Sequence, residues 1–138
     1  MRLYNTNGKL VYKNVNSKLI DWDGKSRSKI QFTTKQFLKK FWSKHICYEE
    51  FPVYGTRMSV DILNATKKIA IEVQGQQHEE YNRFFHKNRL NYFYSIQRDY
   101  NKRKWLEKNN YSLVEINHDE IGELSEDFFW DKFEINLR

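Results

Sequence analysis

The chain has 138 residues, a formal net charge of +6, and a composition that is 39% hydrophobic and 17% aromatic. This length suits one domain with one core, and the many aromatic side chains supply a large buried area. The N-terminus lacks the apolar run of a signal peptide, and no stretch reaches the ~18 apolar residues that a membrane span needs. We therefore expect a single domain over residues 1–138 with no membrane segment.

The use of cysteine bears on the compartment in which the protein works. Cys47 is the only cysteine of the chain, which excludes a disulfide within the chain and a cysteine metal cluster. A lone cysteine of this kind is more often a small buried apolar side chain than a nucleophile. We expect Cys47 to be buried and the protein to work in a reducing cytoplasm.

The charges are distributed unevenly along the chain. Residues 1–46 contain eleven Lys or Arg against two acids, residues 81–108 contain eight against two, and the last thirty residues contain two against eight. Two basic blocks on one small domain indicate an anionic partner, with nucleic acid first among the candidates. A lysine-rich solvated surface is the ordinary alternative.

The N-terminal segment, residues 1–32, is predicted to be rich in β-structure. Residues 3–4 and 10–12 flank a polar turn and have the composition of a hairpin. Residues 19–22 are a candidate for a further short strand. Asp21 and Asp23 are typical turn or capping acids.

A helix is predicted next, beginning at a cap on Thr33 or Thr34 and ending at about His45. Its apolar residues fall on one stripe, which is typical of core packing. The members of the stripe are Phe37, Leu38, Phe41 and Trp42, and the lysines expected on the other faces are Lys35, Lys39, Lys40 and Lys44. Cys47 is expected at the end of a helix or the start of a strand, and residues 49–53 are expected to lead into a turn at residues 54–56.

A hairpin is predicted from residues 59–63 and 69–74, joined by the polar turn 64–68. Each strand places one acid between apolar neighbours, Asp61 in the first and Glu72 in the second. Side chains alternate along a strand, so each acid faces away from those neighbours. Two adjacent buried carboxylates are costly unless a cation neutralises them, whereas a solvated sheet face needs no cation.

The remaining chain is predicted to form a helix over residues 88–109, a strand over 111–116, and an acidic, aromatic, helix-like segment capped by Ser125. The helix is expected to end at Asn109 and Asn110, which tolerate the left-handed conformation. The fold class is therefore α/β or α+β, with a small mixed sheet flanked by helices. Residues 33–116 would form the core of the domain and residues 117–138 a C-terminal extension.

Several motifs follow one another in an order that has a counterpart in a known family. They are Asp61…Glu72-x-Gln74, Gln74-Gly75-x-x-His78, Arg98-Asp99 and the strand through Glu115 and Ile116. The ordered set resembles the PD-(D/E)XK nuclease superfamily, in which the final lysine is sometimes glutamine. Within it, the chain is similar to the very-short-patch repair endonucleases, to phage homing endonucleases with an EDxHD motif, and to small tailed-phage proteins of this type. The resemblance covers roughly residues 28–116.

This resemblance implies a restriction-endonuclease-like fold and a DNA endonuclease that uses Mg²⁺ or Mn²⁺. Asp61, Glu72 and the carbonyl of Val73 would bind the metal, which neutralises charge and activates a water. Gln74 would position a water or phosphate by hydrogen bonds, without the charge of a lysine. Histidine titrates near neutrality, so His78 would transfer a proton, and Asp99 would orient it or reach the metal through water.

The catalytic set includes one more position, Gln31, which stands where the branch has a leading glutamate. Gln36, Glu49 and Glu50 are alternative equivalents of that glutamate. Plausible phosphate contacts are Lys35, Lys39, Lys40, Arg98, Lys102, Arg103 and Lys104. DNA is the expected partner and RNA is left open; target choice would need a homodimer, a separate specificity partner or substrate shape.

Two other functions are left open by the sequence. Glutamine at positions 31 and 74 is what a nuclease fold that has lost catalysis and only binds nucleic acid would show. The acidic, aromatic C-terminus is also what a protein–protein module would use as its docking surface.

Overall fold

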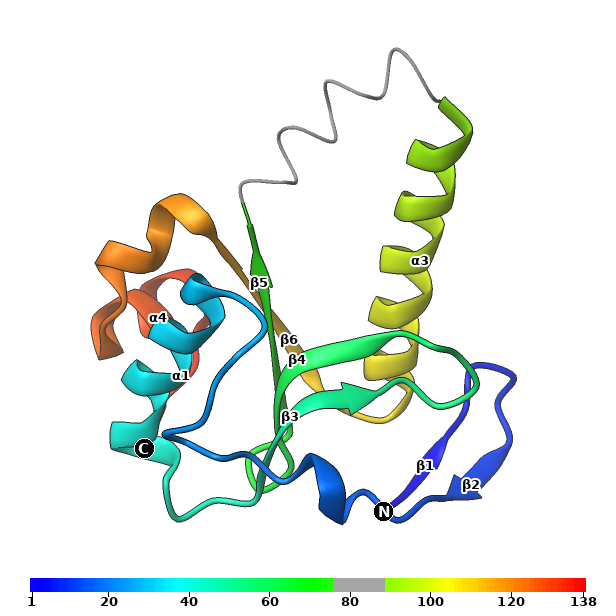
Figure 1. The fold of residues 1–138 in the computed structure, drawn as a ribbon, viewed down its shortest axis with the longest axis horizontal. Helices are drawn as coiled ribbons and strands as arrows, with labels where there is room; N and C mark the ends of the chain where they lie inside the picture. The colour runs from blue at the N-terminus through cyan, green and yellow to red at the C-terminus, as the bar shows by residue number, and fades with distance from the viewer. Residues whose placement is uncertain (76–88) are drawn as a thin grey trace.

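The computed structural model describes residues 1–75 and 89–138, which form a mixed α+β fold, as predicted (Figure 1). The elements in chain order are β1 (Arg2–Tyr4), β2 (Leu10–Tyr12), the 3₁₀ helix η1 (Asn16–Lys18), α1 (Lys29–Trp42), β3 (Cys47–Pro52), β4 (Ser59–Asn64), β5 (Ile69–Gln74), α3 (Arg89–Lys108), β6 (Ser112–Asn117), the 3₁₀ helix η2 (His118–Glu123) and α4 (Glu126–Phe133). None of the helices in these two ranges is long and apolar enough to cross a membrane.

The main sheet has four strands in the order β3-β4-β5-β6, and β1 and β2 form a separate hairpin. The pairs β3–β4 and β4–β5 are antiparallel, whereas β5 and β6 are parallel. A parallel pair needs a crossover connection, and α3 lies in it. The sheet is therefore mixed, and β5, which carries Glu72, is one of its two central strands.

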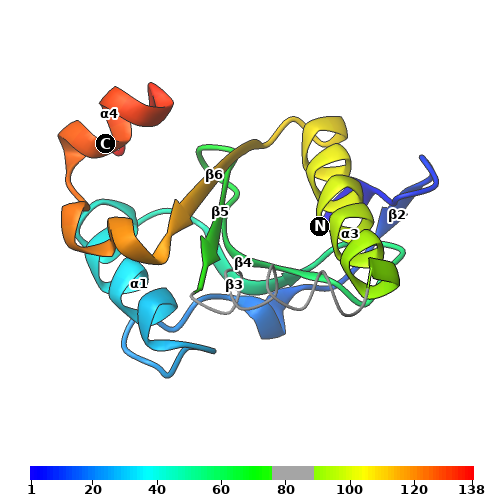
Figure 2. The same cartoon turned by 90° about the horizontal axis from the view of Figure 1, so that it is seen from above.

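Each face of the sheet is covered by a different group of elements (Figures 1 and 2). On one face, Ile62 and Ile71 pack with Trp42 of α1 and Phe129 of α4. The opposite face packs against α3 and the β1–β2 hairpin, and its buried residues include Leu3, Phe51, Tyr54, Val60, Leu63, Ala70, Trp105 and Leu106. The side chain of Glu72 belongs to this second face, because it alternates with Ile71 and Val73, which pack on the first face. Along β4 the strict alternation breaks at Asp61, since Val60 packs on the second face and Ile62 on the first.

The first long helix begins earlier than predicted. Ser28 is its cap, accepting a hydrogen bond from the backbone N–H of Gln31 at 3.2 Å. Thr33 and Thr34 are not caps, because their hydroxyls bond to carbonyls four residues back, at 3.0 and 2.8 Å, inside the helix. The helix also ends at Trp42 rather than at His45. The predicted boundary between residues 32 and 33 therefore falls inside α1.

Two further expectations were wrong. Residues 19–22 form no strand, only a single bridge from Leu19 to Tyr48. Residues 47–52 form the edge strand β3, so Cys47 starts a strand, one of the two expected places for it. Lys35 is fully buried rather than exposed on the helix surface. By contrast, Cys47 is buried as predicted.

The later elements agree closely with the predictions made from the sequence. The predicted helix 88–109 is α3, Arg89–Lys108, and Asn110 just beyond it has a left-handed φ of 65°. The predicted strand 111–116 is shifted by one residue, to Ser112–Asn117. Ser125 caps α4 by accepting a hydrogen bond from the N–H of Phe128 at 3.0 Å.

The C-terminal aromatic residues are largely part of the core. Phe129 is completely buried and stacks on Phe37 of α1, with ring centroids 5.9 Å apart. Leu137 is buried as well, and its carbonyl accepts a hydrogen bond from the indole of Trp42 at 3.1 Å. Among the aromatic side chains of this segment, only that of Trp130 is largely exposed. A docking surface here would have to rely on Trp130, because the neighbouring rings are packed.

Candidate functional site

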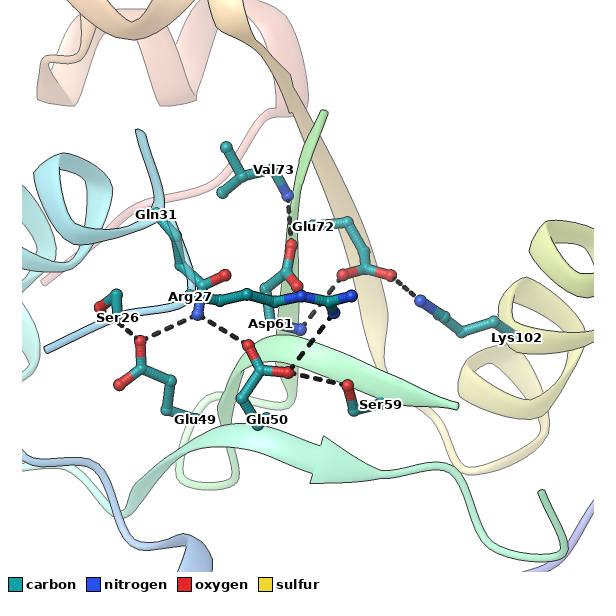
Figure 3. A network of polar contacts seen from close by, with 10 residues as sticks. All are labelled: Ser26, Arg27, Gln31, Glu49, Glu50, Ser59, Asp61, Glu72, Val73 and Lys102. Carbon is teal, nitrogen blue, oxygen red and sulfur yellow. Dashed lines mark hydrogen bonds and ion pairs between the residues drawn. The ribbon is translucent and has the colours of Figure 1, made fainter. Parts of the chain in front are cut away.

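The backbone pairing of β4 with β5 stops one position before the two acids. The paired residues run from Asn64 and Ile69 to Ile62 and Ile71. Beyond them, the backbone N–H of Asp61 donates to Glu72 Oε2 at 3.1 Å, and the N–H of Val73 donates to Asp61 Oδ2 at 2.8 Å (Figure 3). Each carboxylate is thus held by the backbone of the other strand through one oxygen, and its second oxygen is left for other contacts.

A third carboxylate reaches the same place because of an unusual backbone angle. In β3, Glu49 pairs with Ile62 and Phe51 pairs with Val60, while Glu50 between them has a φ of 53°. A non-glycine residue in this left-handed region costs about 1 kcal/mol. Successive strand side chains normally point to opposite faces, but this angle turns Glu49 and Glu50 toward one cluster. The strain is therefore located where acidic groups converge.

Gln31 of α1 connects these two glutamates. Its amide Nε2 donates to Glu49 Oε2 at 2.9 Å and to Glu50 Oε1 at 3.1 Å. A glutamate at position 31 would have no proton to donate and would add a third negative charge. Gln36, in contrast, bonds to the carbonyl of Trp22 and has no contact with this cluster. The geometry therefore groups Gln31 with both glutamates and leaves out Gln36.

Glu50 is also held from the open side of the cluster (Figure 3). Its Oε2 accepts a hydrogen bond from the hydroxyl of Ser59 at 2.9 Å and lies 3.8 Å from the guanidinium of Arg27. The Arg27 side chain is mostly exposed, so this last pairing is weak. Glu50 is consequently fixed by neutral donors rather than neutralised by a cation.

Two lysines touch the acidic cluster, one from each side. Lys35 Nζ donates to the carbonyls of Asp21 and Gly24, both at 2.8 Å, and to Glu49 Oε1 at 3.0 Å. All three of its protons are used, and its side chain has no exposed area. A phosphate cannot reach Lys35, whose role is internal. Lys102 of α3 contacts Glu72 Oε1, and its side chain is 18% exposed.

The pKa of Asp61 reflects this concentration of acids. Burial, and next the charge of Glu72, raise the pKa of Asp61 to about 8, with a smaller contribution from Glu50 and an opposing one from the Val73 N–H. An acid whose ionisation is resisted in this way marks a position where a cation would be favoured.

The donor set fits a hard cation. Mg²⁺ is bound through oxygen atoms, usually one or two carboxylates with waters completing the octahedron. Asp61 has one oxygen outside the backbone bonds, whereas the second oxygen of Glu72 contacts Lys102. Among residues 1–75 and 89–138, no three His, Cys, Asp or Glu side chains gather into a metal-binding group.

A cleft of about 560 Å³ lies beside the carboxylates, between α3 and the loop that joins β3 to β4. Its charged lining residues are Arg27, Arg57, Arg98, Asp99 and Lys102. Lys102 belongs both to this lining and to the ion pair with Glu72, so the acidic cluster adjoins the cleft. Basic walls next to an acidic pair suit an anionic substrate that reacts at a bound cation. Sequence reasoning missed Arg27 and Arg57, since neither lies on a patterned element.

The other predicted catalytic residues are placed as follows. Asp99 is exposed and lines the cleft, and it forms no ion pair with Lys102 or Arg103, which instead contact Glu72 and Glu115. Gln74 is half-buried at the end of β5, two positions after Glu72 and so on the same sheet face. His78 lies outside the described residues. Its pairing with Asp99 therefore stays a prediction.

The predicted phosphate contacts are not all near the cleft. Arg98 and Lys102 line it. Lys39 pairs with Asp23 at 2.7 Å, and Lys40 lies over the Phe37 ring, both on α1 across the sheet. Arg103 pairs with Glu115, and Lys104 lies 3.7 Å from Glu107; neither lines the cleft. The structure thus brings together two of the seven residues and adds Arg27 and Arg57.

Comparisons with known proteins give little further information. No family model and no solved structure matches the chain. A stretch of 65 residues, 47% of this chain, is 32% identical to "Uncharacterized protein 033L" of Invertebrate iridescent virus 3. The match covers 34% of the viral protein, so the chain spans about a third of that relative's length. The name of this relative states no activity.

Proposed function

We propose that the protein is an endonuclease that hydrolyses DNA phosphodiester bonds with the help of Mg²⁺ or Mn²⁺. The observation that supports this most directly is the clamped pair of Asp61 and Glu72 beside a cleft with four basic side chains. Carboxylates alone would repel a phosphate, and basic walls alone would only bind it. Both together suit a phosphodiester held next to a cation-binding pair.

The metal would be held by Asp61, Glu72 and the carbonyl of Val73. A bound divalent cation neutralises charge on the phosphate and makes a water molecule more acidic. Arg27, Arg57 and Arg98 would contact the phosphates on either side of the cut. These residues bind and orient the substrate and do not take part in bond breaking.

The other polar residues would handle water and protons. Glu50, held by Ser59 and Gln31, would accept a hydrogen bond from the attacking water. Gln74 would hydrogen-bond the water or a phosphate oxygen, while His78 and Asp99 would deliver the proton to the leaving oxygen. In this arrangement Glu49 and Glu50 would serve in place of the leading glutamate that the nucleases resembling this chain have at the position of Gln31.

The test is cleavage of supercoiled plasmid, and of mismatched and branched duplexes, in Mg²⁺ or Mn²⁺. Asp61→Asn and Glu72→Gln should each lower the rate by at least about 10³-fold, because each removes a charged ligand without changing shape. Asp131→Asn, the same change on the exposed surface of α4, is the matched control and should leave the rate unchanged. Cleavage that survives Asp61→Asn would contradict the proposal.

A second candidate is a nucleic-acid-binding protein without catalytic activity. It is favoured by Gln74, which is neutral where the related enzymes usually have lysine. Binding of DNA or RNA that needs no metal and survives Asp61→Asn, with no cleavage of any substrate, would select it.

The remaining parts of the proposal concern the setting of the activity. The protein would act in the cytoplasm of a host cell and be encoded by a phage or another mobile element. Target choice would come from a second copy of the chain or from a separate specificity partner. Light scattering with and without DNA would report whether two copies assemble on one substrate.

A further inference from the structure

We propose that Lys102 provides the positive charge of this site and changes partner during the reaction, from Glu72 to the phosphate of the substrate. The inference rests on the proposed function, and it assigns to Lys102 of α3 the positive charge that the neutral Gln74 of β5 cannot supply. Three observations support it: the contact of Lys102 with Glu72, the partial exposure of its side chain, and its position in the lining of the cleft.

The contact with Glu72 is at the oxygen that a metal would need. Glu72 Oε2 accepts the backbone N–H of Asp61, while Oε1 contacts the ammonium of Lys102. A divalent cation held by the pair would compete with the ammonium for Glu72, because two positive charges at one carboxylate repel each other. Lys102 would then be released from Glu72.

The cleft offers the released ammonium of Lys102 another position. Lys102 lines the cleft together with Arg57 and Arg98, and its side chain is 18% exposed. A lysine has a flexible four-carbon stem and a compact head with three rotatable donors. The ammonium can therefore turn from Glu72 to a phosphate oxygen in the cleft while the backbone of α3 stays in place.

The chemistry explains why a charge is needed there. The oxygen of a water molecule forms a bond to phosphorus as the ester P–O bond breaks, and a proton from the water ends on the leaving oxygen. Water is the only co-reactant. Negative charge on the phosphate oxygens must be stabilised in the transition state, and a preorganised charged donor does so better than a neutral amide such as Gln74.

Mn²⁺ titration by calorimetry tests the exchange without any cleavage. Lys102→Gln should bind Mn²⁺ about tenfold more tightly than the wild type, because the competing ammonium is gone. Lys102→Arg should bind it severalfold more weakly, because a guanidinium grips a carboxylate with two hydrogen bonds. Lys132→Gln is the matched control: it removes another lysine–glutamate pair, with Glu120, across the sheet, and should change nothing.

Cleavage kinetics test the second half of the proposal. Lys102→Gln should lower kcat by about 10²-fold with little change in KM, the pattern of a group that acts in the transition state. The double variant Lys102→Gln with Gln74→Lys should recover part of that loss, because the charge returns from β5. A loss confined to KM would show that Lys102 is an ordinary phosphate contact and would overturn this role.

The outcomes separate the two proposals. An unchanged Mn²⁺ affinity in folded Lys102→Gln and Lys102→Arg, checked by circular dichroism, would overturn the exchange whether or not the wild type cuts DNA. If the wild type cuts no substrate, the nuclease proposal fails. Tighter binding of Mn²⁺ by Lys102→Gln would still establish the exchange at Glu72.

Discussion

The acidic cluster has two flanks, and each contributes one lysine–glutamate pair. On the α1 flank, Lys35 has no exposed side-chain area and bonds to Glu49 and two carbonyls. On the α3 flank, Lys102 is partly exposed and touches only one carboxylate oxygen among the described residues. The same residue type therefore serves two purposes. Lys35 is fixed by three acceptors, whereas Lys102 has one partner that another cation can replace.

The largest effect should come from removing the two lysines in turn. Lys35→Met leaves the charge of Glu49 without its cation and removes a donor from the carbonyls of Asp21 and Gly24, and should lower the free energy of unfolding by about 3–5 kcal/mol. Lys102→Met leaves Glu72 with its bond from the Asp61 N–H and should cost less, about 1–2 kcal/mol. Urea unfolding of both variants measures the difference. Equal losses would mean that the two flanks are not distinct.

A smaller effect is expected from adding a charge on the α1 flank. Gln31→Glu replaces the amide that donates to Glu49 and Glu50 with a third carboxylate, and should destabilise the fold by about 2 kcal/mol at pH 8. The loss should shrink at pH 5, where the introduced carboxylate, crowded by two others, is more readily protonated. Thermal melts at the two pH values measure this. A variant as stable as the wild type at pH 8 would show that the glutamates do not depend on Gln31.

The smallest effect is a pH dependence from Asp61. The pKa of this acid is raised to about 8 in the folded protein and is about 3.9 in an unfolded chain. Between these values the folded state binds more protons, so its stability is full at low pH and falls as pH rises toward 8. In the presence of a chelator, the melting temperature of wild type minus that of Asp61→Asn should fall by a few degrees from pH 5 to pH 6. A flat difference would contradict it.

The central hairpin could be predicted because its information is local. The alternation of Ile71 and Val73 around Glu72 predicts the face that this acid takes, and the pairing of the two strands brings Asp61 opposite to it. The helix α3 was equally clear from its length and its terminal asparagines. In both cases the deciding residues are neighbours in the sequence.

The flanking residues depend on contacts that no local pattern contains. Lys35 looks like a surface lysine until its acceptors, 11 to 14 residues away, are brought to it. Lys102 has the same difficulty, since its partner Glu72 is 30 residues away. The left-handed Glu50 is a further case, because glutamate has no preference for that conformation and only the surrounding contacts hold it there. The start of α1 is a milder case, in which Ser28 and two threonines were all suitable caps.

The crossed bonds between Asp61 and Glu72 have a consequence for the history of such proteins. Each carboxylate replaces a backbone hydrogen bond between β4 and β5, since it accepts a hydrogen bond from a backbone N–H that would otherwise lack a partner. Selection for folding alone would thus keep both acids after an ancestor's activity had been lost. Mutational drift should first erase residues of the site whose side chains satisfy no backbone group of the sheet, Glu50 and Lys102 among them. In descendants of this chain, those two positions would record loss of function sooner than the acidic pair itself.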